Sequence, residues 1–416
     1  MRRSRRSTLL SAFLTLLNDR LGESIVFPLL PFLLTGITSH GRTLGLLTGS
    51  YSVAQFLATP MIGALSDRYG RRPVMAWCVG GTVLGLGLFA ATIAFPWASQ
   101  WPAASAAGVP LILLFAARLI DGFSGGTAAT AGAVLADITP PEERARAFGL
   151  IGVAFGLGFI LGPALGGLLA RQSVTLPVLV AVGFAAVNLV AVLTLLPETH
   201  PPEARIPLPR RRELQPFSQL TNVFRNPQVR RLCGAFFLFF LAFNGFTAML
   251  VLYFRQAFGW GPDLAALAFL VVGVVATVVQ GGLIGPLVQR LGEWRLSLAG
   301  LGSVIAGCLL IPLATPATAI PLVFTGVSLL ALGTGLVTPC LRSLVSRRLG
   351  DSGQGVALGS LQGLQSAGSF LGPPLAGLAY DTAGPHSPFW LGISLLVGVA
   401  ALVAGGLPGQ ARADAG

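Results

Sequence analysis

Apolar runs long enough to cross a membrane occur twelve times in this chain of 416 residues, six in each half. A helix needs about 20 apolar residues to cross the roughly 30 Å hydrocarbon core of a bilayer. Helices of this length satisfy all their backbone polar groups internally, as a bilayer requires. The runs span residues 9–35, 44–65, 73–95, 109–136, 146–170, 177–197, 232–254, 264–287, 296–314, 319–341, 354–379 and 387–407. We therefore expect an all-α membrane protein with twelve transmembrane helices.

Composition excludes several other classes of protein. Hydrophobic residues make up 53% of the chain and charged residues 10%, which is too apolar for a soluble domain or a disordered chain. The chain contains no Lys, so the P-loop motif of ATPases is absent and we expect transport energy to come from a gradient. His40, His200 and His386 fall in expected loops, which argues against a histidine metal site. We expect no enzyme activity and no cofactor.

All 27 basic residues are Arg, and their positions indicate orientation in a membrane. With the N-terminus in the cytoplasm, only Arg42, Arg171 and Arg255 fall outside the cell, while Arg20 and Arg118 lie within spans. This bias predicts a multi-pass protein of the plasma membrane with both termini cytoplasmic. It also explains the positive net charge without a nucleic-acid partner.

A polar break separates the two sets of runs. It contains Pro201, Pro202 and the basic cluster Arg210–Arg212, which is typical of a linker. We predict an N-terminal six-helix bundle at residues 1–197, a cytoplasmic linker at 198–231 and a C-terminal six-helix bundle at 232–416. Residues 217–224 fit either a short interfacial helix or a solvated linker.

The two halves repeat each other. Residues Gly158–Gly167 align with Gly368–Gly377 at an offset of 210, including a Gly-Pro pair, and Gly63–Arg72 align with Gly285–Trp294 at an offset of 222. Duplicated halves are a feature of secondary transporters, in which one half moves against the other around a central site. The repeat therefore predicts transport by alternating access and two pseudo-symmetric bundles.

The loop after the second run has a defined pattern of glycines and charges. Its residues are Gly63, Asp67, Arg68, Gly70, Arg71 and Arg72. This segment resembles the loop motif of the major facilitator superfamily, in the position where that family has it. We expect the two glycines to permit a tight turn, Asp67 to face a helix N-terminus, and the arginines to pair with acids such as Asp137. These contacts would form a cytoplasmic gating latch; the alternative is an ordinary cytoplasmic loop.

Within the fourth run, Arg118, Asp121, Gly122 and Gly126 resemble the family's R-x-x-x-G-x-x-x-G element. We expect the arginine and both glycines to share one helical face. A guanidinium inside a span is costly unless it faces a wet cavity or an acid, which makes Arg118 a functional candidate. A purely structural pair between Arg118 and Asp121 is the alternative.

Two acids in the first run lie one helical turn apart. Asp19 and Glu23 share a face, and the segment is similar to the first helix of family exporters. Glu23 is expected near the bilayer centre, at about the depth of Arg118, and we predict that the two meet across a cavity and couple transport to protons. Alternatively, Arg20 neutralises both acids within the helix.

The fifth run resembles the motif of the antiporter branch of the superfamily. It contains Gly158, Gly162, Pro163, Gly166 and Gly167, which allow bending and close packing and so suggest a hinge or seal. A glycine-rich packing face alone would give the same pattern. In the seventh run, Asn244 lies among phenylalanines and is a candidate for the central cavity; core or lipid-facing phenylalanines are the alternative.

The resemblance extends over essentially the whole chain and implies a drug/proton antiporter of the multidrug and tetracycline exporter type. Such a protein is a monomer in the bacterial inner membrane that exports small amphiphilic or drug-like molecules. Its partners are the substrate, protons and the lipid bilayer. Proton-coupled uptake or export of a metabolite, or an uncoupled membrane receptor or scaffold, remain as alternatives.

Overall fold

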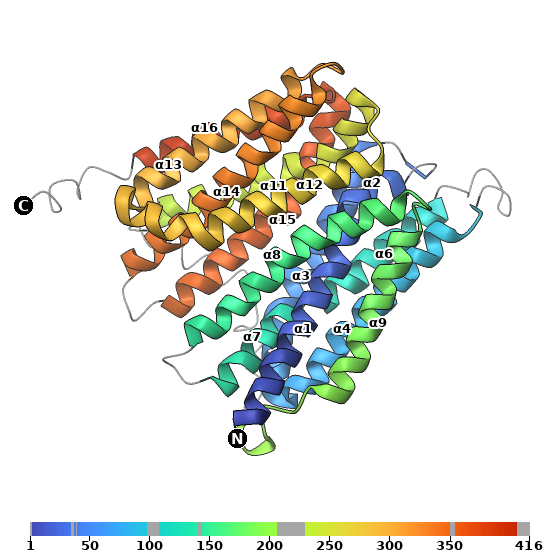
Figure 1. Cartoon of the computed structure of the whole chain (residues 1–416), viewed down its shortest axis with the longest axis vertical. Helices are drawn as coiled ribbons and strands as arrows, with labels where there is room; N and C mark the ends of the chain where they lie inside the picture. Colours follow the sequence, from blue (N-terminus) through green and yellow to red (C-terminus); the bar gives the residue numbers. More distant parts are fainter. Residues whose placement is uncertain are drawn as a thin grey trace, which may run out of the picture. The chain divides into compact units, whose positions relative to one another are not determined.

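The computed structural model describes residues 2–34, 37–38, 40–97, 108–139, 144–205, 229–349 and 354–405 (Figure 1). Every secondary-structure element in these ranges is a helix, which confirms the all-α prediction. The predicted interfacial helix at residues 217–224 lies outside the described residues.

Helices of the first half coincide with the first six apolar runs. They are α1 (Arg2–Val26), η1 (Phe27–Leu29), α2 (Leu30–Leu33), α3 (Gly41–Tyr69), α4 (Arg71–Ala94), α6 (Gly108–Ser124), α7 (Thr127–Ile138), α8 (Arg144–Ala170), α9 (Leu176–Leu195) and η3 (Pro202–Ala204). The first run becomes 3-10 at Phe27–Leu29 because Pro28 and Pro31 cannot donate the hydrogen bonds that would continue α1.

Helices of the second half coincide with the other six runs. They are α11 (Arg230–Phe258), α12 (Pro262–Val278), the π-helical turn η4 (Val279–Leu283), α13 (Ile284–Leu313), α14 (Ala319–Leu349), α15 (Gln354–Ala383) and α16 (Ser387–Ala404). Helix α13 contains a sharp break at Gly292, where φ is 76°. This break separates the predicted runs 264–287 and 296–314.

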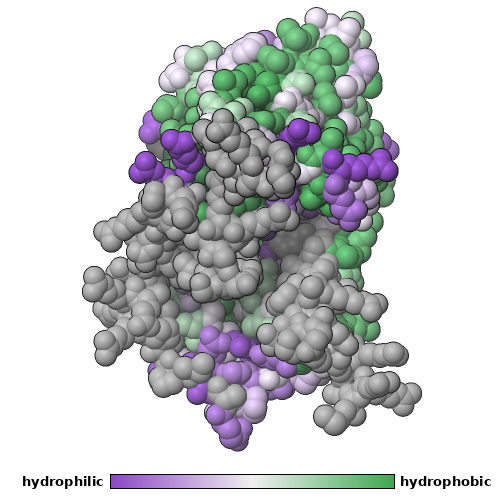
Figure 2. All heavy atoms as spheres, turned by 90° about the vertical axis from the view of Figure 1, so that its left-hand side faces the viewer, coloured by the Kyte–Doolittle hydropathy of each residue, from purple (hydrophilic) through white to green (hydrophobic). Residues whose placement is uncertain are grey.

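Seven helical stretches of the described chain are long and apolar enough to cross a membrane. Large hydrophobic side chains project outward from these helices, among them Trp77 (80% exposed), Ile112 (69%) and Leu313 (64%). Figure 2 shows such hydrophobic residues covering much of the upper part of one face. A water-facing surface rarely carries so much contiguous apolar area, whereas a lipid-facing surface requires it.

The chain divides into two compact units. Unit 1 contains the described residues of Met1–Gln215 and Trp260–Leu270, and unit 2 contains those of Pro216–Gly259 and Val271–Gly416. The change from one unit to the other after Gln215 falls within the predicted linker, while the start of α12 groups with unit 1. The predicted domain limits themselves stay a prediction.

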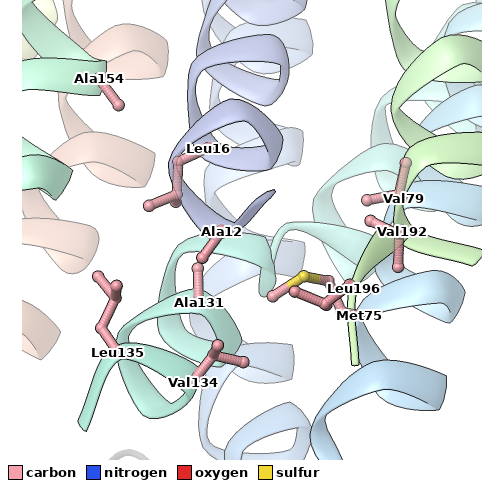
Figure 3. Packing of buried hydrophobic residues seen from close by; sticks show 10 residues of the cluster. All are labelled: Ala12, Leu16, Met75, Val79, Ala131, Val134, Leu135, Ala154, Val192 and Leu196. Carbon is pink, nitrogen blue, oxygen red and sulfur yellow. The ribbon is translucent and has the colours of Figure 1, made fainter. Parts of the chain in front are cut away.

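A buried hydrophobic cluster holds the helices of unit 1 together (Figure 3). Its side chains come from α1, α4, α7, α8, α9 and the residue after α9. They are Ala12, Leu16, Met75, Val79, Ala131, Val134, Leu135, Ala154, Val192 and Leu196. Small residues in this set let the helix backbones approach closely, which supplies much of the packing energy inside a membrane.

The repeated glycines make corresponding contacts in the two units. On α8, Gly158 and Gly162 lie against Arg20 and Ser24 of α1, and a Cβ added to Gly162 would come within 2.7 Å of the Ser24 Cβ. The hydroxyl of Ser24 donates to the carbonyl of Gly158 at 2.8 Å. In unit 2, Gly368 and Gly372 of α15 lie in the same way against Leu241 and Gly245 of α11.

Close packing is therefore one role of these glycines in both halves. Gly166 also faces α1, at the carbonyl of Ile25, while Gly167 faces Ala266 of α12. Pro163 lies inside α8 without ending it. The hinge or seal function of the segment stays a prediction.

Candidate functional site

A polar pocket inside unit 1 is formed by α1, α3, α4 and α6 and by the break that follows α6. Five of its lining residues are ionisable acids or arginines. The lining consists of Asp19, Arg20, Glu23, Val26, Tyr51, Thr82, Leu86, Arg118, Asp121 and Gly125. The helices that carry these residues pack closely, since a Cβ on Gly85 of α4 would come within 2.9 Å of the backbone nitrogen of Asp121 on α6.

Arg20 bridges both acids of α1. Its Nη2 donates to Asp19 Oδ2 at 2.6 Å, and its Nη1 donates to Glu23 Oε2. The predicted contact between Glu23 and Arg118 is absent from this structure, although both line the pocket. The local pair forms instead because Arg20 precedes Glu23 by three residues on the same helix, where a contact requires no rearrangement of the chain.

Arg118 is held loosely on the other side of the pocket. Its Nη1 lies 3.8 Å from Asp121 Oδ2, an ion-pair distance that is too long for a hydrogen bond. Its guanidinium carbon is 4.7 Å from the centre of the Tyr51 ring, within cation–π range. Its Nε is buried without a hydrogen-bond partner. The predicted local pair of Arg118 and Asp121 is present, but it leaves donors of the guanidinium free to reorganise.

Three carboxyl groups and two guanidiniums line this pocket, so its charges do not balance. Asp19, Glu23 and Asp121 provide up to three negative charges against the two positive charges of Arg20 and Arg118. A net charge is costly in the low dielectric of a membrane protein. One bound proton neutralises the set. The exposed fraction of the side chain is 38% for Glu23, 9% for Asp19 and 12% for Asp121, so Glu23 is the acid that solvent reaches most readily.

Tyr51 lines the site and Gln55 bonds to it, and no sequence pattern had indicated either residue. Gln55 Nε2 donates to the Gly125 carbonyl at 3.1 Å and to the Tyr51 hydroxyl at 3.3 Å. These bonds tie α3 to the chain break that ends α6. The sequence does show a tyrosine and a glutamine one helical turn apart in an apolar run. Their link to the site becomes visible only in the structure, where the Tyr51 ring contacts Arg118.

The fourth run is not one continuous helix, which corrects the predicted shared face. Helix α6 ends at Ser124 and α7 begins at Thr127, because the Gly125-Gly126 pair does not hold the helical conformation. Even so, Gly122 and Gly126 both lie against α3, next to Ala54 and Ile62 respectively. Close packing on α3 therefore survives the break.

Arg71 is the centre of the predicted gating motif. Its guanidinium donates to Asp137 Oδ2 at 3.0 Å, to Asp67 Oδ1 at 2.5 Å and to Ser66 Oγ at 2.7 Å. Gly70, the residue before it, has φ 104°, so α3 can end and α4 can begin with a single residue between them. The predicted pairing with Asp137 is thus made by Arg71.

Other parts of the motif differ from the prediction. Gly63 lies inside α3 rather than in a turn, because that helix continues to Tyr69. Arg68 lies over the ring of Tyr69 at 5.3 Å. Arg72 donates to the carbonyl of Leu193 on α9. Neither arginine forms an ion pair with Asp137 within the described residues.

Glu198 caps the N-terminus of α4, a role that we had assigned to Asp67 for a nearby helix. Its carboxylate accepts from the backbone nitrogen of Arg71 at 2.8 Å and from that of Arg72 at 3.2 Å. The next residue, Thr199, donates to Asp137 Oδ2 at 3.1 Å. Asp67 instead uses its carboxylate for the guanidinium of Arg71. The start of the linker is therefore fastened to the motif loop.

Asn244 is not among the residues that line the pocket. It belongs to unit 2, where its Nδ2 donates to the carbonyl of Phe240 in the preceding turn of α11 at 2.8 Å. Phe236, Phe239 and Phe246 on the same helix are fully buried. Most of the aromatic residues around Asn244 therefore serve as core. Among the residues searched in the described chain, no group of three His, Cys, Asp or Glu could hold a metal ion.

Comparison with known proteins agrees with the observed fold. The model of the Major Facilitator Superfamily matches residues 12–371. The class C tetracycline resistance protein of Escherichia coli is 34% identical over 386 residues, covering 92% of this chain and 91% of that protein. The class G protein of Vibrio anguillarum is 31% identical over 374 residues, covering 88% and 89%. The crystal structure of the human organic anion transporter MFSD10 (TETRAN) has a TM-score of 0.68 at 28% identity and covers 96% of this chain and 99% of that one.

Proposed function

The chain belongs to the major facilitator superfamily, and we propose that it exports small amphiphilic or drug-like molecules in exchange for protons by alternating access. The observation that carries this proposal is the charge imbalance of the unit 1 pocket, where three carboxyl groups face two guanidiniums. The tetracycline resistance proteins that it resembles favour efflux over uptake.

Glu23 is the acid to which we assign the proton. When Glu23 is ionised, Arg20 holds it and Asp19 together, and the pocket carries one excess negative charge. Protonation of Glu23 removes that charge and weakens its bond to Arg20, while the bond of Arg20 to Asp19 remains. A neutral pocket can be closed from water at a lower free-energy cost than a charged one.

Asp121 and Arg118 form the second, looser pair of the proposed mechanism. Since Arg118 is 3.8 Å from Asp121, a small movement of α6 can bring its guanidinium to another acid of the pocket. Such a switch supplies a contact that differs between two conformations, which coupling requires. At about 150 mV, one entering proton supplies roughly 3.5 kcal/mol, enough for about a 300-fold gradient of a neutral solute.

The cytoplasmic loop and the glycine-rich helix take conformational roles in the proposal. Arg71, with Asp67 and Asp137, stabilises one conformation of the gate on the cytoplasmic side. The glycines of α8 pack closely against α1, so the two helices move together and act as a seal or hinge. We further propose a monomer in the bacterial inner membrane, with both termini in the cytoplasm, as the placement of arginines favours.

Proton movement in proteoliposomes tests this function. The purified protein is reconstituted with a pH-sensitive dye inside, and tetracycline, ethidium, a neutral drug and glucose are added in turn. We expect a proton flux opposite to the solute flux for amphiphilic compounds, and none in Glu23→Gln. Glu203→Gln, at an exposed position of η3, is the matched control.

Three other results would contradict this assignment, and each points to a different mechanism. Proton and solute fluxes in the same direction would make the protein a symporter. Solute flux without proton flux would make it a uniporter or assign another coupling ion. An unchanged proton flux in Glu23→Gln would move the proton to Asp19 or Asp121.

A further inference from the structure

Unit 2 contains a partly buried arginine, Arg342, with contacts of its own. Arg342 is part of α14 and falls inside the membrane-length stretch Ala319–Val345. Its Nη2 donates to Oε1 of Gln365 on α15 at 2.6 Å. Its guanidinium carbon lies 5.9 Å from the ring centre of Phe236 on α11, a side chain with no exposed surface. Three helices of unit 2 therefore surround this cation.

Arg342 differs from the buried arginines of unit 1 in its partners. Arg20, Arg71 and Arg118 each lie within 4.0 Å of a carboxylate oxygen. For Arg342, by contrast, no ion pair is found within the described part of the chain, and its Nε is buried without a hydrogen-bond partner. Glu293 on α13 accepts a hydrogen bond at its Oε1 from the hydroxyl of Ser343, the residue after Arg342, at 2.7 Å.

Within the described residues, the partners found for this positive charge are an amide oxygen and an aromatic ring. An arginine does not lose its proton in a protein, so the charge persists. A cation in a membrane span is costly unless it meets a counter-charge, and such residues mark substrate pathways by default. The guanidinium fork matches two coplanar oxygen atoms, as in a carboxylate.

Gln365 adds a second feature that suits an anion. Its Oε1 is occupied by Arg342, so its amide NH2 group is left as a donor beside the guanidinium. We propose that Arg342 and Gln365 form an anion-binding site that takes the carboxylate group of an amphiphilic substrate. This inference rests on the proposed transport of small molecules and names one chemical group that the substrate carries.

The test uses two probes of the same shape and different charge, 2-naphthoate and 2-naphthamide. Equilibrium binding of both is measured to the whole protein in nanodiscs of zwitterionic lipid. We expect the wild type to bind naphthoate about tenfold more tightly than naphthamide, a ratio worth about 1.4 kcal/mol. Because the readout is a ratio of two dissociation constants, it does not depend on proton coupling.

Gln365→Glu is the decisive variant. It places a tethered carboxylate next to Arg342, so the guanidinium is already occupied and the preference for naphthoate should disappear. The added ion pair should also preserve folding. Gln362→Glu introduces the same charge at an exposed position one turn earlier on α15 and should keep the wild-type ratio. Arg342→Lys keeps the charge without the fork and should show an intermediate ratio.

Three results would overturn the proposal: a wild type that binds both probes equally, a Gln365→Glu variant with the wild-type ratio, or loss of the preference in nanodiscs that contain anionic lipid. The last result would assign the same site to a lipid headgroup phosphate. A preserved ratio effect together with absent proton flux would contradict the proposed antiport while leaving the anion site in place.

Discussion

The loop after α3 and its copy inside α13 have a similar backbone conformation but carry different charges. Gly70 and Gly292 occupy matching positions of the repeat, and both have positive φ, at 104° and 76°. The following residue is Arg71 in the first copy and Glu293 in the second. Both copies therefore keep the sharp turn between helices, which depends on a glycine without a Cβ.

The residues that follow the turn have different partners in the two copies. Arg71 contacts two carboxylates and a hydroxyl, and Glu198 caps the helix that begins with it. Glu293 accepts one hydrogen bond from Ser343. Duplication has kept the geometry that reverses the chain, while the residue that follows the glycine changes from a cation, Arg71, to an anion, Glu293.

Replacing the central residue of each copy should give the largest difference. Arg71→Met removes the charged partner of Asp137, whose side chain is only 21% exposed, and should destabilise the protein by about 2 kcal/mol. The maximal transport rate should fall about tenfold, with little change in KM, because the cycle must populate the conformation that the latch stabilises; a tenfold loss corresponds to about 1.4 kcal/mol. Thermal unfolding and initial transport rates measure the two effects.

Glu293→Met is the matched substitution in the second copy. It removes the carboxylate that accepts from Ser343 Oγ. We expect smaller losses in both measurements than for Arg71→Met, which takes a guanidinium away from two carboxylates, Asp67 and Asp137. Equal losses in the two variants would show that both copies act as latches.

Alanine at the two turn glycines should separate backbone strain from crowding. Both substitutions meet a cost of about 1–3 kcal/mol, because φ is positive and ψ is near 160° at both glycines, a region that residues with a Cβ avoid. At Gly70 the new Cβ would also lie 2.9 Å from Cδ of Glu198, whereas at Gly292 no atom lies within 4 Å. We expect Gly70→Ala to lower the melting temperature more than Gly292→Ala. The reverse order would mean that Glu198 moves away without loss.

Glu198→Gln should have a smaller effect than either change at the turn. The amide oxygen can keep the bond from the backbone nitrogen of Arg71, but the bond from that of Arg72 and the negative charge at the helix N-terminus are lost, at about 1 kcal/mol. Glu203→Gln serves as the control because Glu203 is exposed and lies in η3. Equal melting temperatures for the two variants would show that the charge of Glu198 does not stabilise the protein.

Glu293→Gln should be the mildest change of all. The amide oxygen can replace the carboxylate as acceptor for Ser343 Oγ, so the expected loss is below about 0.5 kcal/mol. Its melting temperature should match the wild type within error. A loss as large as that of Glu198→Gln would show a charged network in the second copy as well.

Sequence alone predicted the features that depend on local patterns. The helices follow from the length of the apolar runs, and the Arg71–Asp137 pair follows from a motif whose residues have fixed spacing. Pairing of Arg20 with Asp19 and Glu23 was one of two arrangements that the spacing allowed, and helix geometry alone does not choose between them.

Features that depend on contacts between distant segments were missed. Glu198 lies 127 residues from the backbone nitrogen that it caps, and no periodic pattern links the two. Arg342 was placed outside the membrane because its charge ends the apolar run at residue 341, whereas α14 continues to Leu349. Tyr51 became part of the site only through the packing of α3 against α6.

The assignment of the transported proton to Glu23 is tested most directly by two assays of Glu23→Gln in the same proteoliposomes. The first is solute efflux driven by an imposed pH gradient, and the second is exchange of labelled for unlabelled solute at equal pH on both sides. We expect gradient-driven efflux to fall to the rate of empty liposomes while exchange continues, because Glu23 carries the proton and is not required for folding. Gradient-driven efflux at the wild-type rate would contradict it.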